Sequence, residues 1–192
     1  MKKLIIIAAM ALMSVAAMAQ EIKFAVVDFN EIVMLMPEMD EARATLEENS
    51  KTNEEILMTM YDEYQNKMKQ YQQNAGTWSQ SIRELKEKEL VDIETRLQQS
   101  QQSLQQELQE LQQSLQAPIV AKANNAINEI AKAKGVAAVY DRSTFLYVDE
   151  AQVINLTSDV REAVGIPEGR TLETLQAEMM AKAQAAQAAM AQ

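Results

Sequence analysis

The sequence predicts a mainly helical protein with a small β component (α+β), in which one long antiparallel helical hairpin forms a coiled-coil arm. Three observations lead to this prediction: an eleven-residue apolar repeat on both sides of a short turn, a β-branched run near the N-terminus, and more short apolar runs after Gly135. An eleven-residue repeat corresponds to about 3.67 residues per turn, so two such helices pack nearly straight. We therefore expect a long, thin arm joined to a small body.

The first nineteen residues have the pattern of a signal peptide. Lys2 and Lys3 provide a positive start, residues 4 to 16 an apolar run, and residues 17 to 19 (AMA) a small-x-small cleavage site. We predict cleavage after Ala19 and a periplasmic location. An uncleaved anchor is the alternative, but the apolar run is shorter than the about 20 residues that span a bilayer. No stable membrane insertion is expected after cleavage.

Charge and residue usage exclude several kinds of function. The chain has a formal net charge of −10, which becomes −12 without Lys2 and Lys3, so it lacks the basic face that nucleic acids and anionic membranes require. It contains no histidine and no cysteine, which removes most metal sites, thiol nucleophiles and the usual general base. We predict no enzymatic activity, and hence no catalytic residues, metal site or cofactor.

A strand and a short helix are expected before the arm. Residues 24 to 29 (FAVVDF) are rich in β-branched and aromatic side chains and predict a strand that is buried on one face. Asn30 is expected to cap a short helix, which ends at Pro37. Because proline suits the first position of a helix, the arm is predicted to begin there. We assign residues 20–37 and 117–169 to the body, 38–116 to the hairpin arm and 170–192 to a tail.

The two helices of the arm, spanning about residues 38 to 134, are expected to pair across a turn at residues 74 to 79. Positions that would face each other have numbers that add up to a constant, as antiparallel pairing requires; Tyr71 is thus expected opposite Ile82, and Met68 opposite Leu85. A single continuous helix is the alternative, but it does not explain the constant. The predicted seam consists of Leu46, Leu57, Met60, Met68, Tyr71, Ile82, Ile93, Leu97, Leu104 and Leu108.

The turn carries helix-ending and helix-starting residues. Gly76 can adopt the positive φ that ends many helices. Thr77 with Gln80, or Ser81 with Glu84, has the spacing of a capping box that would open the second helix.

The chain after the arm has mixed structure. Pro118 is expected to kink the second helix, which ends at Gly135. Residues 136–140 and 145–148 are predicted to form a β-hairpin through the turn at 141–144, followed by a small helix that Thr157 or Ser158 caps and that runs to about Val164. The tail is rich in Ala, Gln and Met; it can be helical, but its small apolar surface leaves a frayed or disordered tail as the alternative.

Three stretches and the order of the elements resemble the Skp (OmpH-like) family of periplasmic outer-membrane-protein chaperones. The stretches are FAVVDFNEI, LQAPIVAKANNAINEIAKAKG and AAVYDRSTFLYVDEAQVINLTSDV, and the resemblance covers about residues 24 to 164. It implies a homotrimer, in which strands of three chains form a small β-barrel-like trimerisation body and three arms surround a cavity for unfolded outer-membrane proteins. The residues expected in the trimer body are Phe24, Val26, Val139, Phe145 and Tyr147.

Residues in the outer half of the arm are candidates for contact with an unfolded protein, which we call the client. Methionine is flexible and polarizable, and so suits contacts with many partners. Ile56, Met58 and Trp78 lie off the seam or at the tip, and Tyr61 lies near them. We predict that these four side chains contact the client.

The resulting hypothesis is an ATP-independent periplasmic holdase chaperone that binds and encloses unfolded outer-membrane proteins and prevents their aggregation. The expected partners are those clients and two further copies of the chain. The alternative is a structural protein of the bacterial envelope, in which the coiled coil serves as a spacer or tether. An activity that keeps a client soluble without nucleotide would distinguish the two.

Overall fold

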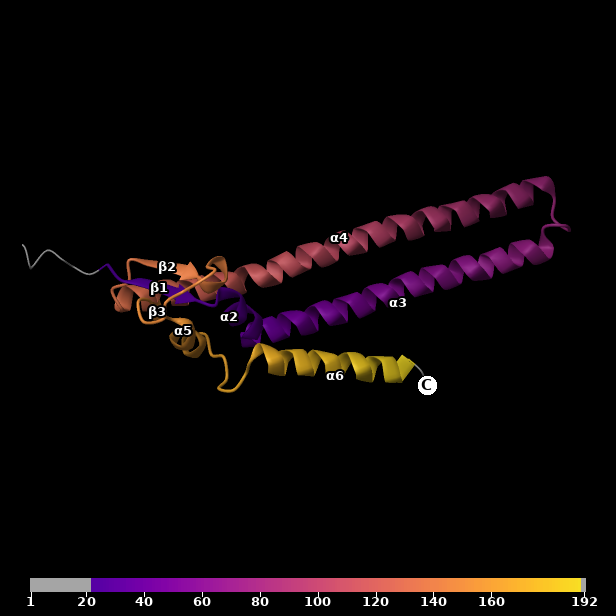
Figure 1. Ribbon diagram of the computed structural model, residues 1–192. Helices are drawn as coiled ribbons and strands as arrows, with labels where there is room; N and C mark the ends of the chain where they lie inside the picture. The colour runs from indigo at the N-terminus through magenta and orange to yellow at the C-terminus, as the bar shows by residue number, and fades with distance from the viewer. Residues whose placement is uncertain (1–21, 191–192) are drawn as a thin grey trace, which may run out of the picture. The chain divides into compact units, whose positions relative to one another are not determined.

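The computed structural model describes residues 22 to 190, so the predicted signal peptide and its cleavage site after Ala19 lie outside the described residues. The chain forms two compact units. We call the unit from Met36 to Ala121 the arm, and the unit made of the residues up to Leu35 and from Lys122 onward the body. Figure 1 shows the helices and strands of each.

The body contains an open three-stranded sheet in the order β2-β1-β3, with both neighbours parallel to β1. The strands are β1 (Phe24–Val27), β2 (Ala138–Asp141) and β3 (Ile154–Asn155). Phe24 lies opposite Ala138 in the register, and Ala25 lies opposite Ile154. Among the described residues, no further strand pairs with the outer edges of β2 and β3, so the expected barrel-like closure is not made within one chain.

The core of the body surrounds β1. Ala25, Val26 and Val27 are all at most 3% exposed, which explains why the strand reads as a continuous apolar run rather than an alternating one. The short helices α2 (Phe29–Leu35) and α5 (Thr157–Ala163) add fully buried side chains, including Ile32 and Val160. Helix α2 begins one residue before Asn30, and the Asp28 carbonyl accepts its first hydrogen bond, so Asn30 is not the cap.

The predicted β-hairpin between residues 136 and 148 is wrong. After β2 the chain turns into the short 3-10 helix η1 (Arg142–Thr144), because the Asp141 carboxylate accepts a hydrogen bond from the Ser143 amide at 2.9 Å. Residues 145–148 form no strand, and β2 pairs with β1 instead. The third strand is β3, which the sequence pattern did not indicate.

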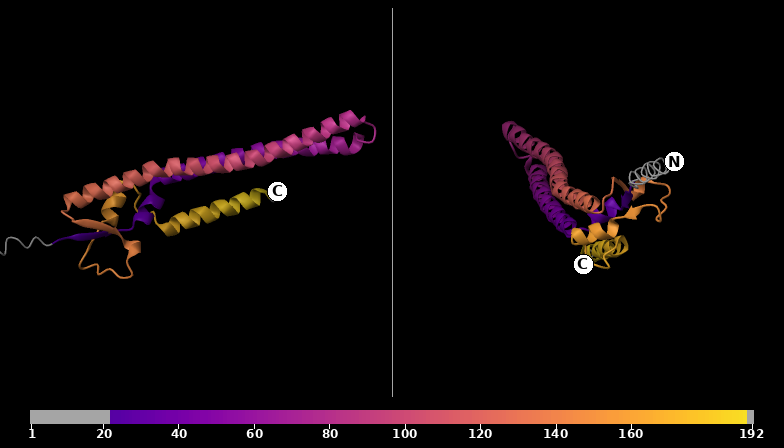
Figure 2. Two further views of the ribbon diagram at one scale, coloured as in Figure 1. Left: turned by 90° about the horizontal axis from the view of Figure 1, so that it is seen from above. Right: turned by 90° about the vertical axis from the view of Figure 1, so that its left-hand side faces the viewer.

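The helical hairpin is confirmed. Helix α3 (Pro37–Asn74) begins at the predicted proline, and α4 (Gln80–Ala133) runs back beside it in the opposite direction (Figures 1 and 2). The turn differs from the expectation: Gly76 does not adopt positive φ, since the first turn after α3 stays right-handed at Ala75. Neither expected capping box forms; the Ser79 hydroxyl accepts from the Ile82 amide at 3.4 Å.

Helix α4 continues through Pro118 and ends as expected. Gly135 adopts a φ of 65°, and the amides after the helix turn back onto it: the Val136 amide donates to the Ala131 carbonyl at 2.9 Å. This is the pattern in which a left-handed glycine terminates a helix.

Residues 172 to 190 form a helix, so the disordered alternative for the tail is wrong over that range. Helix α6 (Leu172–Met190) starts at a reciprocal cap: the Thr171 amide donates to the Thr174 hydroxyl at 2.9 Å, and the Thr174 amide donates to the Thr171 hydroxyl at 3.2 Å. Its first turns pack on α2, where Leu175 is 4% exposed. The cap and the buried Leu175 stabilise the start of the helix. The residue composition alone did not predict either feature.

Substitution of Thr157 tests the link between the end of β1 and α5. The Thr157 hydroxyl accepts a hydrogen bond from the Asp28 amide at 3.0 Å, and Thr157 is the buried polar residue of the described core. Thr157→Val keeps the shape but leaves that amide unsatisfied, so we expect a loss of about 1 to 3 kcal/mol in the free energy of unfolding. Urea unfolding followed by circular dichroism measures this loss.

Thr95→Val, at an exposed position of α4, is the control, and we expect its free energy of unfolding to stay close to that of the wild type. Equal urea midpoints for the two variants would contradict a stabilising role of the Thr157 hydrogen bond.

Candidate functional site

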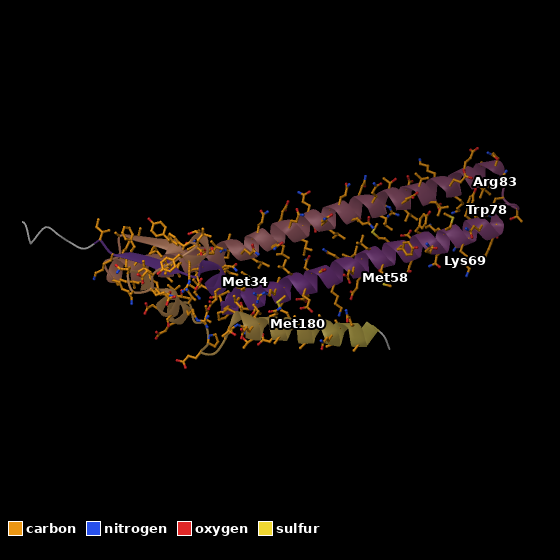
Figure 3. The ribbon with its side chains drawn as sticks, viewed as in Figure 1. Met34, Met58, Lys69, Trp78, Arg83 and Met180 are labelled. Atoms are coloured by element: carbon orange, nitrogen blue, oxygen red, sulfur yellow. The ribbon has the colours of Figure 1, made fainter. Side chains whose placement is uncertain are left out.

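Three of the four predicted client-contacting side chains are exposed on α3. Met58 is 68% exposed, Tyr61 53% and Ile56 43%. Figure 3 shows Met58 on α3 and Trp78 in the turn. Trp78 is only half-exposed, because its ring packs edge-on against Tyr71 with the ring centroids 6.0 Å apart. Trp78 therefore closes the tip of the seam and offers less surface than the other three.

The other helix of the arm adds exposed apolar side chains that the sequence pattern missed. Leu85 and Val91 are more than half exposed, and Ile82 is 43% exposed. The placement of Ile82 in the seam is therefore wrong. Arg83 and Lys86 take the half-buried positions along the seam instead. The sequence pattern gave no sign of this, because charged residues are expected on the solvent side of a helix.

The rest of the predicted seam is buried or half-buried. Ile93 is its most buried member at 2% exposed, and Leu90, not predicted, is also buried. The half-buried members are Leu46, Leu57, Met60, Met68, Tyr71, Leu97, Leu104 and Leu108. The seam is one side chain wide, so most of its residues keep an edge in solvent.

Polar side chains bridge the two helices near the tip. The Tyr71 hydroxyl donates a hydrogen bond to the Glu87 carboxylate. Glu89 meets Lys67, with 3.3 Å between the Lys67 Nζ and the carboxylate. Ile82, expected opposite Tyr71, is exposed instead, and apolar spacing alone did not predict these polar bridges.

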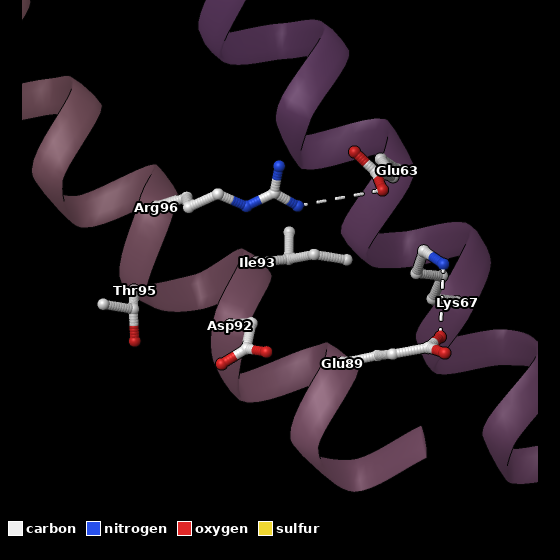
Figure 4. Close-up of a pocket in the computed structure, with 7 residues that line it drawn as sticks. All are labelled: Glu63, Lys67, Glu89, Asp92, Ile93, Thr95 and Arg96. Carbon is white, nitrogen blue, oxygen red and sulfur yellow. Dashed lines mark hydrogen bonds and ion pairs between the residues drawn. The ribbon is translucent and has the colours of Figure 1, made fainter. Parts of the chain in front are cut away.

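These bridges line a cavity of about 490 Å³ between α3 and α4 (Figure 4). Ile93 lies at its apolar side, and the ion pairs Lys67–Glu89 and Arg96–Glu63 cross it. The second pair is looser, at 4.0 Å, and both pairs are partly exposed. The cavity thus has acidic and basic side chains around one buried isoleucine. These ion pairs hold the two helices together, and the mixed charge does not favour a site for one charged ligand.

Two titratable groups that take part in the polar bridges, Glu89 and Tyr71, have pKa values shifted by their partners. Hydrogen bonds from Lys86 and then Lys67 lower the pKa of Glu89 from its ordinary value. The hydrogen bond to Glu87 raises the pKa of Tyr71, because the neighbouring carboxylate disfavours a phenolate. The pKa shift at Glu89 thus comes first from Lys86 on the same helix and then from Lys67 across the arm, whereas the pKa shift at Tyr71 comes from Glu87 across the arm.

The body presents a second exposed apolar surface, which we call the aromatic face. Tyr140 packs against Phe24 and, edge-on, against Phe145, with ring centroids 6.4 Å and 5.5 Å apart. Beside them Leu146 is fully exposed and Tyr147 is 80% exposed. The aromatic rings and Tyr147 line an apolar cavity of about 410 Å³.

The five residues expected in a trimer body separate into two groups. Phe24, Phe145 and Tyr147 belong to the aromatic face, whereas Val139 is half-buried and Val26 is 2% exposed and serves the core. Sequence reasoning missed Tyr140 and Leu146; the run of four apolar residues after η1 is a usable signal for an exposed surface, but it fits a strand equally well.

In residues 22 to 190, no group of three or more acidic, histidine or cysteine side chains is placed to hold a metal ion. Within the same residues, no helix has the length and apolar character needed to cross a membrane.

Comparisons with known proteins match most of the described chain. A family model described as "Outer membrane protein (OmpH-like)" matches residues 23–164. The chaperone protein Skp of Pectobacterium atrosepticum is 25% identical over 142 residues, which cover 74% of this chain and 85% of Skp.

A solved structure has a similar fold. It is that of a candidate OmpH-like outer membrane chaperone from Caulobacter crescentus CB15, with a TM-score of 0.67 and 17% sequence identity. The similarity covers 74% of this chain and 83% of that protein. Helix α6 lies beyond the residues that the family model matches.

The lowered pKa of Glu89 predicts a pH-dependent contribution to stability. A depressed carboxyl pKa stabilises the folded state above the unfolded-state value of about 4.3, and this contribution is lost as pH falls through the folded-state pKa. We expect the urea midpoint of Glu89→Gln to lie below that of the wild type at pH 7, and the two midpoints to converge below about pH 4. Glu94→Gln, at an exposed position of α4, is the control. A difference that stays constant with pH would contradict the role of the Lys86 and Lys67 hydrogen bonds.

Proposed function

Because the chain belongs to the OmpH-like outer membrane protein family, we propose that it is an ATP-independent holdase that binds unfolded outer-membrane proteins in the periplasm and prevents their aggregation. The observation that carries the proposal is the arm itself: a hairpin whose narrow seam leaves Met58, Tyr61 and Val91 in solvent. Exposed apolar side chains on both helices give apolar segments of a client several places to make contact. The predicted signal peptide supports the location.

The contacts available to a client are many and individually weak. The exposed apolar residues of the arm are spaced along two helices rather than collected in one deep pocket. Such a surface fits no single folded ligand closely, but it can meet apolar side chains that an unfolded chain presents in any order. Methionine and tyrosine adapt to different partners more readily than branched side chains do.

We propose further that three copies assemble through the aromatic face of the body and so place three arms around one client. Leu146 and Tyr147 are exposed next to Phe145, whose ring packs on Tyr140, and contact with another copy would remove this apolar surface from water. The free edges of β2 and β3 also favour pairing with a strand of another copy. This assembly would supply the enclosed cavity that a single arm lacks.

Nothing in the chemistry of the arm favours an enzyme. The perturbed groups Glu89 and Tyr71 are held by neighbouring side chains of the opposite helix or the next turn, and no nucleophile lies beside them. We infer that the chain acts by binding alone.

Trimer assembly is tested by sedimentation of the mature chain, residues 20 to 192. We expect a trimer at micromolar concentration and a monomer for Leu146→Asp, since burial of a leucine contributes about 1.5 to 3 kcal/mol and a carboxylate cannot be buried unpaired. Leu85→Asp introduces the same charge at an exposed position of the arm and should remain a trimer. A wild-type monomer would contradict the assembly.

Client binding is tested by keeping an unfolded β-barrel protein soluble at a stoichiometric ratio without nucleotide. Because the helices of the arm carry more acidic than basic residues, we expect apolar contacts to dominate, so that affinity changes little between about 50 and 500 mM salt. Met58→Ser should weaken binding, and Glu54→Gln should not. A folded partner bound in place of the client would favour the spacer or tether, and a steep loss of affinity with salt would show that charge attraction dominates.

A further inference from the structure

Helix α6 belongs to the body, and the proposed function gives it no role. Arg161 connects its start to the body: one guanidinium nitrogen pairs with Glu31 of α2, and another donates to the Arg170 carbonyl just before α6. Leu175 then packs into the body. A helix positioned in this way has a defined face, unlike a flexible tail.

The apolar residues of α6 form one stripe that begins on the body and continues into solvent. They are Leu172, Leu175, Met179, Ala183 and Ala186, three or four residues apart, which places them on one side of the helix. Leu175 is 4% exposed, but Leu172 is 40% and Met179 53% exposed, and both alanines are exposed. Figure 3 shows Met180, which flanks the stripe and is also more than half exposed.

Charge separates α6 from the arm. Each of the stretches 41–75 and 79–116 has seven acidic and four basic residues, whereas α6 has two acidic residues, Glu173 and Glu178, and one basic residue, Lys182. Glu178, next to Met179, lies 3.8 Å from the Arg170 guanidinium. An apolar segment with acidic flanking residues therefore meets less repulsion on α6 than on the helices of the arm.

We propose that the stripe of α6 around Met179 is a second contact surface for the client, and that its occupant is an apolar segment of the unfolded polypeptide. This inference rests on the proposed holdase function. A second copy of the chain is the less favoured occupant, since the exposed stripe has only two large side chains and then alanines. That surface is far below the about 1,200 Å² of a stable interface and shorter than the three to four heptads of a stable coiled coil.

A weak surface is sufficient because the client is already held elsewhere. A segment of a polypeptide bound to the arm reaches a second site at an effective concentration that can approach millimolar. One methionine and one leucine then increase the lifetime of the complex without creating a tight site of their own.

Site-directed crosslinking tests the inference, and the cysteine-free sequence makes single labels possible. Met179→Cys in the full mature chain is labelled with a photoactivatable benzophenone and mixed with an unfolded β-barrel outer-membrane protein. Ala181→Cys is the matched control: it is also exposed, but lies on the opposite side because each residue turns the helix by about 100°. Met58→Cys reports contact with the arm.

We expect client adducts for Met58→Cys and Met179→Cys and at least fivefold fewer for Ala181→Cys. Adducts for Met58→Cys alone would overturn the inference and leave the proposed function intact, whereas adducts at none of the three would contradict both. An adduct between two copies for Met179→Cys would assign the stripe to self-association and overturn the inference.

An affinity measurement gives a second readout without a label. Met179→Ala retains the helix, because alanine has the highest helix propensity. We expect the dissociation constant for the client to rise about threefold, as partial burial of one methionine requires, and Ala181→Ser to leave it unchanged. Equal constants for both variants would contradict the inference.

Discussion

The body depends on the parallel pairing of β1 with two strands that follow it by more than a hundred residues. Ala25, Val26 and Val27 are buried on both faces, so β1 is stable only when β2, β3 and the short helices are in place around it. Contacts of such large sequence separation form slowly, because the intervening chain loses entropy when its ends meet. The arm reduces this cost, since pairing of α3 with α4 shortens the effective loop between β1 and β2. The helical hairpin is thus part of how the sheet can form, as well as a surface for binding.

The seam of the arm is narrow, and this has two consequences. Only Leu90 and Ile93 are well buried in the part near the tip, so the two helices are held there also by polar bridges such as Lys67–Glu89. Partly exposed ion pairs contribute little stability each, but they favour one register over another. At the same time a thin seam leaves Met58, Tyr61 and Leu85 in solvent. The arm is stable enough to stay helical and still offers apolar surface along its length.

The features of the fold that could be predicted from the sequence are those determined by neighbouring residues. The hairpin, Pro37 at the start of α3 and the glycine end at Gly135 were predictable, because helix periodicity and helix termini are set by neighbouring residues. The role of residues 145 to 148 was not, since four apolar residues in a row fit a strand as well as an exposed surface. The exposure of Ile82 was not predictable for a related reason: apolar spacing cannot show that Glu87 and Glu89 bond across the helices. Tertiary contacts and side-chain hydrogen bonds decided each of these cases.

In the proposed function, release of the client needs no nucleotide, and the distribution of contacts explains why. A partner that binds only the unfolded state loses its ligand when that ligand folds, so the equilibrium is decided by the stability of the folded client. The apolar side chains that would meet Met58 or Tyr61 are those that a membrane protein turns toward lipid or toward its own chain. Because the contacts are separate, folding can remove them one at a time, and no single step has to break the whole interface. A deep pocket would bind more tightly, but its whole interface would have to break in one step. A long arm with exposed, spaced side chains therefore suits a chaperone that works without ATP.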